Sequence, residues 1–108
     1  MYKGLVVENS LADAKVLRKV KVDSTYRLGD WTLHEVRTTE EQLPQFQSFL
    51  NGGPWYVHFW EEGGDDVKVI FKDRMFDIRY SDKSTWKEAV RHGQSLGIPL
   101  KQLDFSID

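Results

Sequence analysis

Three stretches in the second half of the chain alternate apolar and polar residues with the period of two that is typical of half-buried β-strands. They cover residues 55–60, 67–71 and 76–80. Short polar segments that contain glycine or charged residues separate them. The pattern therefore predicts three consecutive antiparallel strands, a meander, in this part of the chain.

The apolar faces of these strands set the expected pairing. Since a one-residue slip would move every side chain of a strand to the other face, the apolar residues should lie opposite one another. This condition places Phe59 opposite Val67 and Phe71 opposite Phe76. The second pairing needs a tight turn at Asp73–Arg74, which lacks the Gly or Asn that such a turn prefers.

Residues 20–28 and 31–36 are two further alternating stretches, and they flank the dipeptide Gly29–Asp30. Glycine as the first of two loop residues is typical of a type II′ β-hairpin. The sequence therefore predicts a hairpin here, with Leu28 opposite Trp31.

Two segments have the apolar spacing of amphipathic helices. Thr39–Gln42 forms a capping box before the first apolar series, and Pro44 leaves two starting points open, at Thr39 or at Pro44 itself. The second helix opens at residues 84–88 and ends at Gly97, which is a natural residue for a left-handed helix end.

The N-terminal region begins with a short apolar run at residues 4–8, which indicates a strand. Two interpretations stay open for residues 11–19. One is a short helix behind the capping-box-like spacing of Ser10–Asp13, and the other is one long strand that runs from the N-terminal run to Val16.

The resulting element order is β-α-β-β-α-β-β-β-α in a single domain of residues 1–108. We predict an α+β fold with a largely antiparallel sheet packed by two main helices. The first six elements match the ferredoxin-like order, with a hairpin and a helix appended. A sheet covered mainly on one face by helices explains the pattern without that analogy.

The composition is that of a folded chain that has no disulfide bonds. Of 108 residues, 40% are hydrophobic and 14 are aromatic, and there is no cysteine. The lack of cysteine excludes disulfides, thiolate zinc sites and cysteine nucleophiles, and it fits a reducing compartment. No apolar run approaches the length of a membrane span or a signal peptide. The sequence therefore predicts a soluble cytoplasmic protein with no membrane partner.

Charge argues against nucleic acid as a partner. Residues 31–66 carry one Arg against seven carboxylates, while the two flanking regions each have an excess of two cations. Nucleic-acid binders concentrate positive charge on one surface. The stretch 31–37 also lacks the Gly and aromatic pattern that a ferredoxin-like RNA binder needs there.

Four short motifs resemble those of a family of small uncharacterised prokaryotic proteins. They are Gly-Pro-Trp-Tyr at 53–56, Lys-Ser-Thr-Trp at 83–86, Gly-Ile-Pro at 97–99 and Gln-Leu-Asp-Phe at 102–105. The resemblance covers roughly residues 50–105. That family has no established activity, so the resemblance implies a prokaryotic origin and carries over no site residue.

The second face of the meander gathers side chains that can bind a ligand. With the expected pairing, His58 lies opposite Lys68, and Lys68 lies opposite Arg79. Aromatic, imidazole, carboxylate and cationic groups on one surface can hold an anion, a base or a peptide. The predicted binding residues are Tyr56, His58, Trp60, Lys68, Asp77 and Arg79.

Three hypotheses for function follow from this face. The leading one is a non-enzymatic binding module for a protein or a small molecule, with a homodimer packed through the same face as an alternative. The second is a small acid–base enzyme in which His58 is the base, Asp77 orients it, and Arg79 or Lys68 holds an anionic substrate. The third and weakest is a nucleic-acid-associated accessory protein.

The four tryptophans are expected in different environments. The stripe spacing places Trp86 in the core, and alternation places Trp55 there too. Trp31 lies near a hairpin tip and should be half exposed. Trp60 lies on the second face and is the strongest candidate for contact with a ligand or partner.

No cofactor or metal is expected. The three histidines lack the spacing of a metal site. His34 and Glu35 are strand neighbours that point to opposite faces, so they cannot grip one ion together. Residues 61–66 pack four carboxylates around two glycines but lack the EF-hand spacing, so we interpret them as a solvated hairpin tip.

Overall fold

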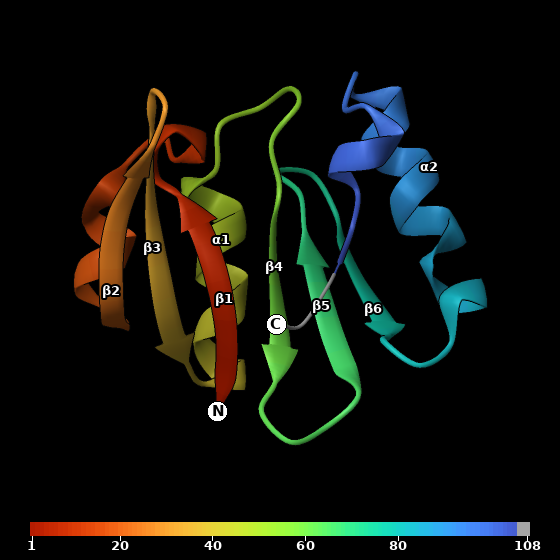
Figure 1. Cartoon of the computed structure of the whole chain (residues 1–108), viewed down its shortest axis with the longest axis horizontal. Helices are drawn as coiled ribbons and strands as arrows, with labels where there is room; N and C mark the ends of the chain where they lie inside the picture. The colour runs from red at the N-terminus through yellow and green to blue at the C-terminus, as the bar shows by residue number, and fades with distance from the viewer. Residues whose placement is uncertain (106–108) are drawn as a thin grey trace.

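The computed structural model describes residues 1–105 and contains one six-stranded antiparallel sheet. The strand order is β2-β3-β1-β4-β5-β6 (Figure 1). The predicted α+β class with a largely antiparallel sheet is confirmed. The strands are β1 (Tyr2–Val7), β2 (Lys21–Leu28), β3 (Trp31–Thr38), β4 (Val57–Glu61), β5 (Asp66–Ile70) and β6 (Met75–Arg79).

The first four strands have the split arrangement of the ferredoxin-like order. β3 returns from the β2–β3 hairpin to lie between β2 and β1, and β4 pairs on the other side of β1. β5 and β6 then extend the sheet as the appended hairpin. Leu28 lies opposite Trp31, as predicted, across a turn in which Gly29 has a φ of 60°.

Helices cover the two faces of the sheet in different places. Helix α1 (Leu43–Phe49) packs on one face over β1 and β4, and it lies behind β1 in Figure 1. Helix α2 (Lys87–Ser95) packs on the opposite face over β5 and β6. The chain therefore builds two cores, an α1-side core and an α2-side core, on opposite faces. None of the described helices is long and apolar enough to cross a membrane.

Short 3₁₀ helices occupy the two segments whose secondary structure had two possible interpretations from the sequence. Residues 11–19 hold the 3₁₀ helix η2 (Ala14–Arg18), capped by the Asp13 side chain, and not a strand running to Val16. Thr39 precedes a separate 3₁₀ turn, and Pro44 lies in the first turn of α1. The helical region therefore starts directly after Thr39, whose side chain makes no capping hydrogen bond, and α1 itself begins at Leu43, one residue before Pro44. Gly97 follows the end of α2 (Lys87–Ser95) with a φ of 91°, as predicted.

The predicted pairing of β4 with β5 was wrong by one residue. Phe59 lies opposite Lys68, and Trp60 lies opposite Val67. The reason is that this part of the sheet is buried on both faces. Val57 and Phe59 pack into the α1-side core, whereas Val67 and Val69 pack into the α2-side core. Alternation cannot tell which face of each strand belongs to which core.

The predicted pairing of β5 with β6 was wrong by two residues, so the faces are kept. Phe76 lies opposite Val69, and a wider loop joins the strands, closed by a 2.7 Å hydrogen bond from Phe71 N to Arg74 O. A two-residue turn of the primed type needs positive φ, which Asp73 and Arg74 do not have. The turn chemistry therefore favoured the wider loop.

Strand β2 is exposed along its whole length. Within residues 1–105 it pairs only with β3, and all eight of its residues are exposed. Alternation along residues 20–28 predicts that Val20, Val22, Tyr26 and Leu28 share one face, but Val22 and Tyr26 lie on different faces because the pairing shifts between Val22 and Ser24. A bulge of this kind also discourages edge-to-edge aggregation.

Candidate functional site

The α2-side face of the sheet is only partly covered. Helix α2 and the segment after it lie over β5 and β6, and they leave the surface of β1 and β3 open beside β4. Two adjoining hollows lie on this open part, and both are lined by Leu5 and His58. We call the two hollows together the aromatic groove.

The larger hollow has a volume of about 500 Å³. One end is formed by Trp31 and Trp55, whose ring centroids are 5.9 Å apart. Ile98 and Pro99, from the segment after α2, also line this hollow. Most of this lining is apolar, which is the usual character of a binding pocket. The lining residues are Leu5, Val7, Trp31, Pro54, Trp55, Tyr56, Val57, His58, Gly97, Ile98, Pro99 and Gln102.

The smaller hollow has a volume of about 240 Å³ and lies farther along β1. Trp60 and Tyr26 bring aromatic rings to it from β4 and β2. Among the described residues, Lys3 and Glu35 bring a basic and an acidic side chain to the lining of the aromatic groove. Their opposite charges leave this surface with little net charge.

The β4 wall of the groove is held in place from behind. The Tyr56 hydroxyl donates a hydrogen bond to the Gln102 carbonyl, and its ring meets Phe105 edge-on at 5.5 Å. Burial, followed by the nearby Asp104 carboxylate, raises the pKa of Tyr56 to about 12. The His58 ring is 6.2 Å from that of Tyr56 and 5.5 Å from that of Trp60. Packed rings of this kind form a preorganised wall.

Three of the six predicted site residues lie in the groove, and three do not. Tyr56, His58 and Trp60 line it. Asp77 and Arg79 alternate with Phe76 and Ile78, which face α2, so they point to the opposite face of the sheet together with Lys68. The one-residue shift between β4 and β5 separates the two sets.

Lys68, Asp77 and Arg79 form ion pairs on their own side. Lys68 Nζ lies 2.6 Å from Asp77 Oδ1 and 3.1 Å from Asp66 Oδ2. Although burial alone would lower it, these carboxylates raise the pKa of Lys68. Arg79 Nε lies 3.6 Å from Asp65 Oδ2. These contacts join β5, β6 and the loop between β4 and β5, which is a structural role.

The positions of His58 and Asp77 bear on the hypothesis that they act as an acid–base pair. His58 and Asp77 face opposite sides of the sheet, so Asp77 cannot orient His58. The predicted catalytic pair is therefore not assembled.

Sequence reasoning missed Trp31 and Trp55 as groove residues. Trp55 was expected in the core because it continues the alternation of Val57 and Phe59. β4 begins only at Val57, and Trp55 belongs to a turn in which its N–H bonds to Gly53 O at 2.8 Å. The signal that marks it is the Gly-Gly-Pro run directly before it, which breaks the strand.

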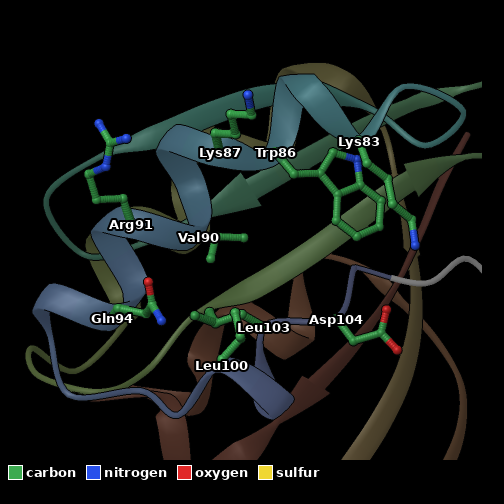
Figure 2. A pocket seen from close by; sticks show the side chains of 9 residues that line it. All are labelled: Lys83, Trp86, Lys87, Val90, Arg91, Gln94, Leu100, Leu103 and Asp104. Atoms are coloured by element: carbon green, nitrogen blue, oxygen red, sulfur yellow. The ribbon is translucent and has the colours of Figure 1, made fainter.

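A second surface hollow, of about 500 Å³, lies between α2 and the residues after it. In Figure 2, Trp86 and Val90 lie on the side of α2 toward Leu103, while the ends of Lys87 and Arg91 point away from the hollow. Lys83 lies above the Trp86 ring at 5.3 Å from its centroid. Lys83, Lys87 and Arg91 thus line this hollow together with the apolar side chains.

Among residues 1–105, no three His, Asp or Glu side chains are grouped so that they could hold a metal ion. The fold and groove define the chain as an α+β domain with an open, aromatic-lined sheet face. No family model, curated protein or solved structure matches it. The resemblance to small prokaryotic proteins therefore stays a prediction.

Proposed function

We propose that this protein is a binding module and that its aromatic groove holds an extended, proline-rich peptide segment of a partner. The observation that carries the proposal is the groove itself, with Trp31 and Trp55 together at one end and Trp60 in the adjoining hollow. Aromatic-lined grooves of this kind recognise polyproline II segments, because proline rings stack on indole and phenol rings.

The charged side chains that line the groove favour an uncharged ligand. Lys3 and Glu35 carry opposite charges, so the groove lacks the excess of cations that nucleic acid or another polyanion requires. A polyproline II segment also suits a wall of packed rings. It is already extended and stiff, so its binding costs little conformational entropy.

A titration with a ten-residue polyproline peptide tests the proposal. Three of the four tryptophans line the groove, so intrinsic fluorescence reports on it directly. We expect a saturable change in emission. Truncating a buried aromatic anchor costs more than about 1 kcal/mol, so Trp31→Ala and Trp55→Ala should each weaken binding by about tenfold.

Tyr80→Ala is the matched control. Tyr80 is 38% exposed and packs on Trp86 outside the groove, so its loss should leave the affinity unchanged. A Gly/Ser peptide of the same length should not bind. The absence of a saturable change with polyproline, or equal affinity in Trp31→Ala, Trp55→Ala and wild-type protein, would overturn the proposal.

A second copy of the chain is the other occupant that the same titration can reveal. Tyr26, Leu28 and Trp31 are exposed apolar side chains beside the groove, and two such surfaces can pair. A mass that rises with concentration in sedimentation, with no response to polyproline, would replace the peptide by a homodimer. A chain without cysteine suits either role in a reducing cytoplasm.

A further inference from the structure

A second cluster of chemically active side chains lies on the opposite face of the sheet, away from the groove. Its members come from the 3₁₀ helix η1 (Glu8–Ser10), from β2 and from β3. His34 Nδ1 lies 2.8 Å from the Thr25 hydroxyl oxygen. His34 Nε2 lies 2.9 Å from a Glu8 carboxylate oxygen. A hydroxyl, an imidazole and a carboxylate thus form one hydrogen-bonded chain.

The carboxylate fixes which ring nitrogen carries the proton. An ionised Glu8 only accepts hydrogen bonds, so the N–H of neutral His34 lies at Nε2 and donates to it. Nδ1 is then the acceptor, and the Thr25 hydroxyl donates its hydrogen to it. The base is therefore aimed at the hydroxyl and held by a third group, which is the arrangement that activates a nucleophile.

The three side chains of this hydrogen-bonded chain differ in how far they are exposed to solvent. His34 is only 8% exposed and lies directly opposite Thr25 across the β2–β3 pair, so its ring is fixed. Thr25 lies on the exposed strand β2, where a reactant in solution can reach it. Glu8 is about half exposed. A fixed base beside an accessible hydroxyl is what a nucleophilic site requires.

A further feature of this cluster is that β2, which carries Thr25, lies at the edge of the sheet. Within the described residues β2 is an edge strand that pairs with β3 alone, so its other side has no neighbouring strand. The hydroxyl of Thr25 therefore lies on an open sheet edge, with its base on β3 and the orienting carboxylate on η1.

We propose that Thr25 is a nucleophile that accepts an acyl group from an activated ester. Thr25 Oγ bonds to the ester carbonyl carbon while His34 Nδ1 takes the hydroxyl proton. The tetrahedral intermediate then collapses, the bond to the leaving oxygen breaks, and the leaving group departs as an alcohol with the proton returned by His34. The products are an acyl-Thr25 ester and a free alcohol, with no redox change. Glu8 acts as a positioning residue.

Treatment with p-nitrophenyl acetate tests this proposal. We expect release of p-nitrophenolate with the gain of one acetyl group in the intact mass, and peptide mapping should place it on Thr25. Thr25→Ala should lose this adduct, and Thr25→Ser should keep it. Because a general base contributes about 100-fold or more, His34→Gln should slow acetylation at this position by that factor.

Glu8→Gln provides a test that does not depend on a buried substitution. It should slow Thr25 acetylation with an unchanged melting temperature, and Glu8→Asp should restore part of the rate, which a purely structural contact would not do. An adduct confined to lysines or the N-terminus, or Thr25 acetylation that proceeds at the wild-type rate in both His34→Gln and Glu8→Gln, would overturn the proposal.

Discussion

Tyr56 connects the groove with the segment that follows α2. One side of its ring lines the larger hollow, and the other packs on Phe71 at 5.7 Å and on Phe105 at 5.5 Å. Its hydroxyl anchors the Gln102 carbonyl. Because ionisation would place a charge among these rings and beside Asp104, the phenol stays neutral in the folded protein up to high pH.

The neutral phenol makes stability depend on pH in the alkaline range. The folded pKa of about 12 lies above the ordinary value of 10, so the unfolded chain loses the Tyr56 proton first. The contribution is complete below pH 10 and is lost as the pH rises to 12. Tyr2, whose pKa burial and Asp66 also raise, adds to this loss.

Urea unfolding at about pH 9 and about pH 11 measures the effect, with stability lower at the higher value. Tyr56→Phe should reduce the difference between the two, and Tyr80→Phe, at an exposed tyrosine outside the groove, should not. An equal difference in Tyr56→Phe and wild-type protein would contradict the assignment.

Among the elements, the central pair β1–β4 contributes buried side chains from both strands to the α1-side core. Gly4 lies directly opposite Phe59, whose ring packs on Phe46 of α1 at 4.9 Å. A Cβ at position 4 would lie 2.4 Å from the Phe59 ring and 2.9 Å from the His58 carbonyl oxygen. The absence of a side chain on Gly4 therefore allows Phe59 to fill the α1-side core.

Gly4→Ala should destabilise the protein by about 1–3 kcal/mol, because the ring of a fully buried phenylalanine and a backbone carbonyl must both move. The free energy of urea unfolding measures this cost. Gly52→Ala is the control, since nothing lies within 4 Å of its Cβ, and it should stay within about 0.5 kcal/mol of wild type. Equal stability of the two variants would contradict the packing described for β1 and β4.

The elements also show where sequence reasoning succeeds. The strands, the two main helices and the Leu28–Trp31 hairpin pairing followed from alternation, helical spacing and glycine positions, whereas the predicted capping boxes do not form. The β4–β5 register did not follow, because both faces of that pair are buried and alternation is equally satisfied by either face. The separation of His58 from Asp77 follows from this one ambiguity.

At the scale of the whole molecule, the groove results from incomplete coverage of a sheet. Helices α1 and α2 pack on opposite faces, and α2 covers only the strands of the appended hairpin. Tyr56, His58 and Trp60 could be selected from the sequence because they share one face of one strand. Trp31 and Trp55 could not, because strands distant in sequence and a turn bring them together.

We expect the aromatic groove, and no other surface, to bind the partner. An amide correlation spectrum of isotopically labelled protein, recorded during titration with the polyproline peptide, measures where the peptide binds. We expect the indole signals of Trp31, Trp55 and Trp60 to shift with the amides of β1, while the Trp86 indole stays in place. Shifts confined to Trp86 and α2, or no shifts at saturating peptide, would contradict binding of the peptide in the aromatic groove.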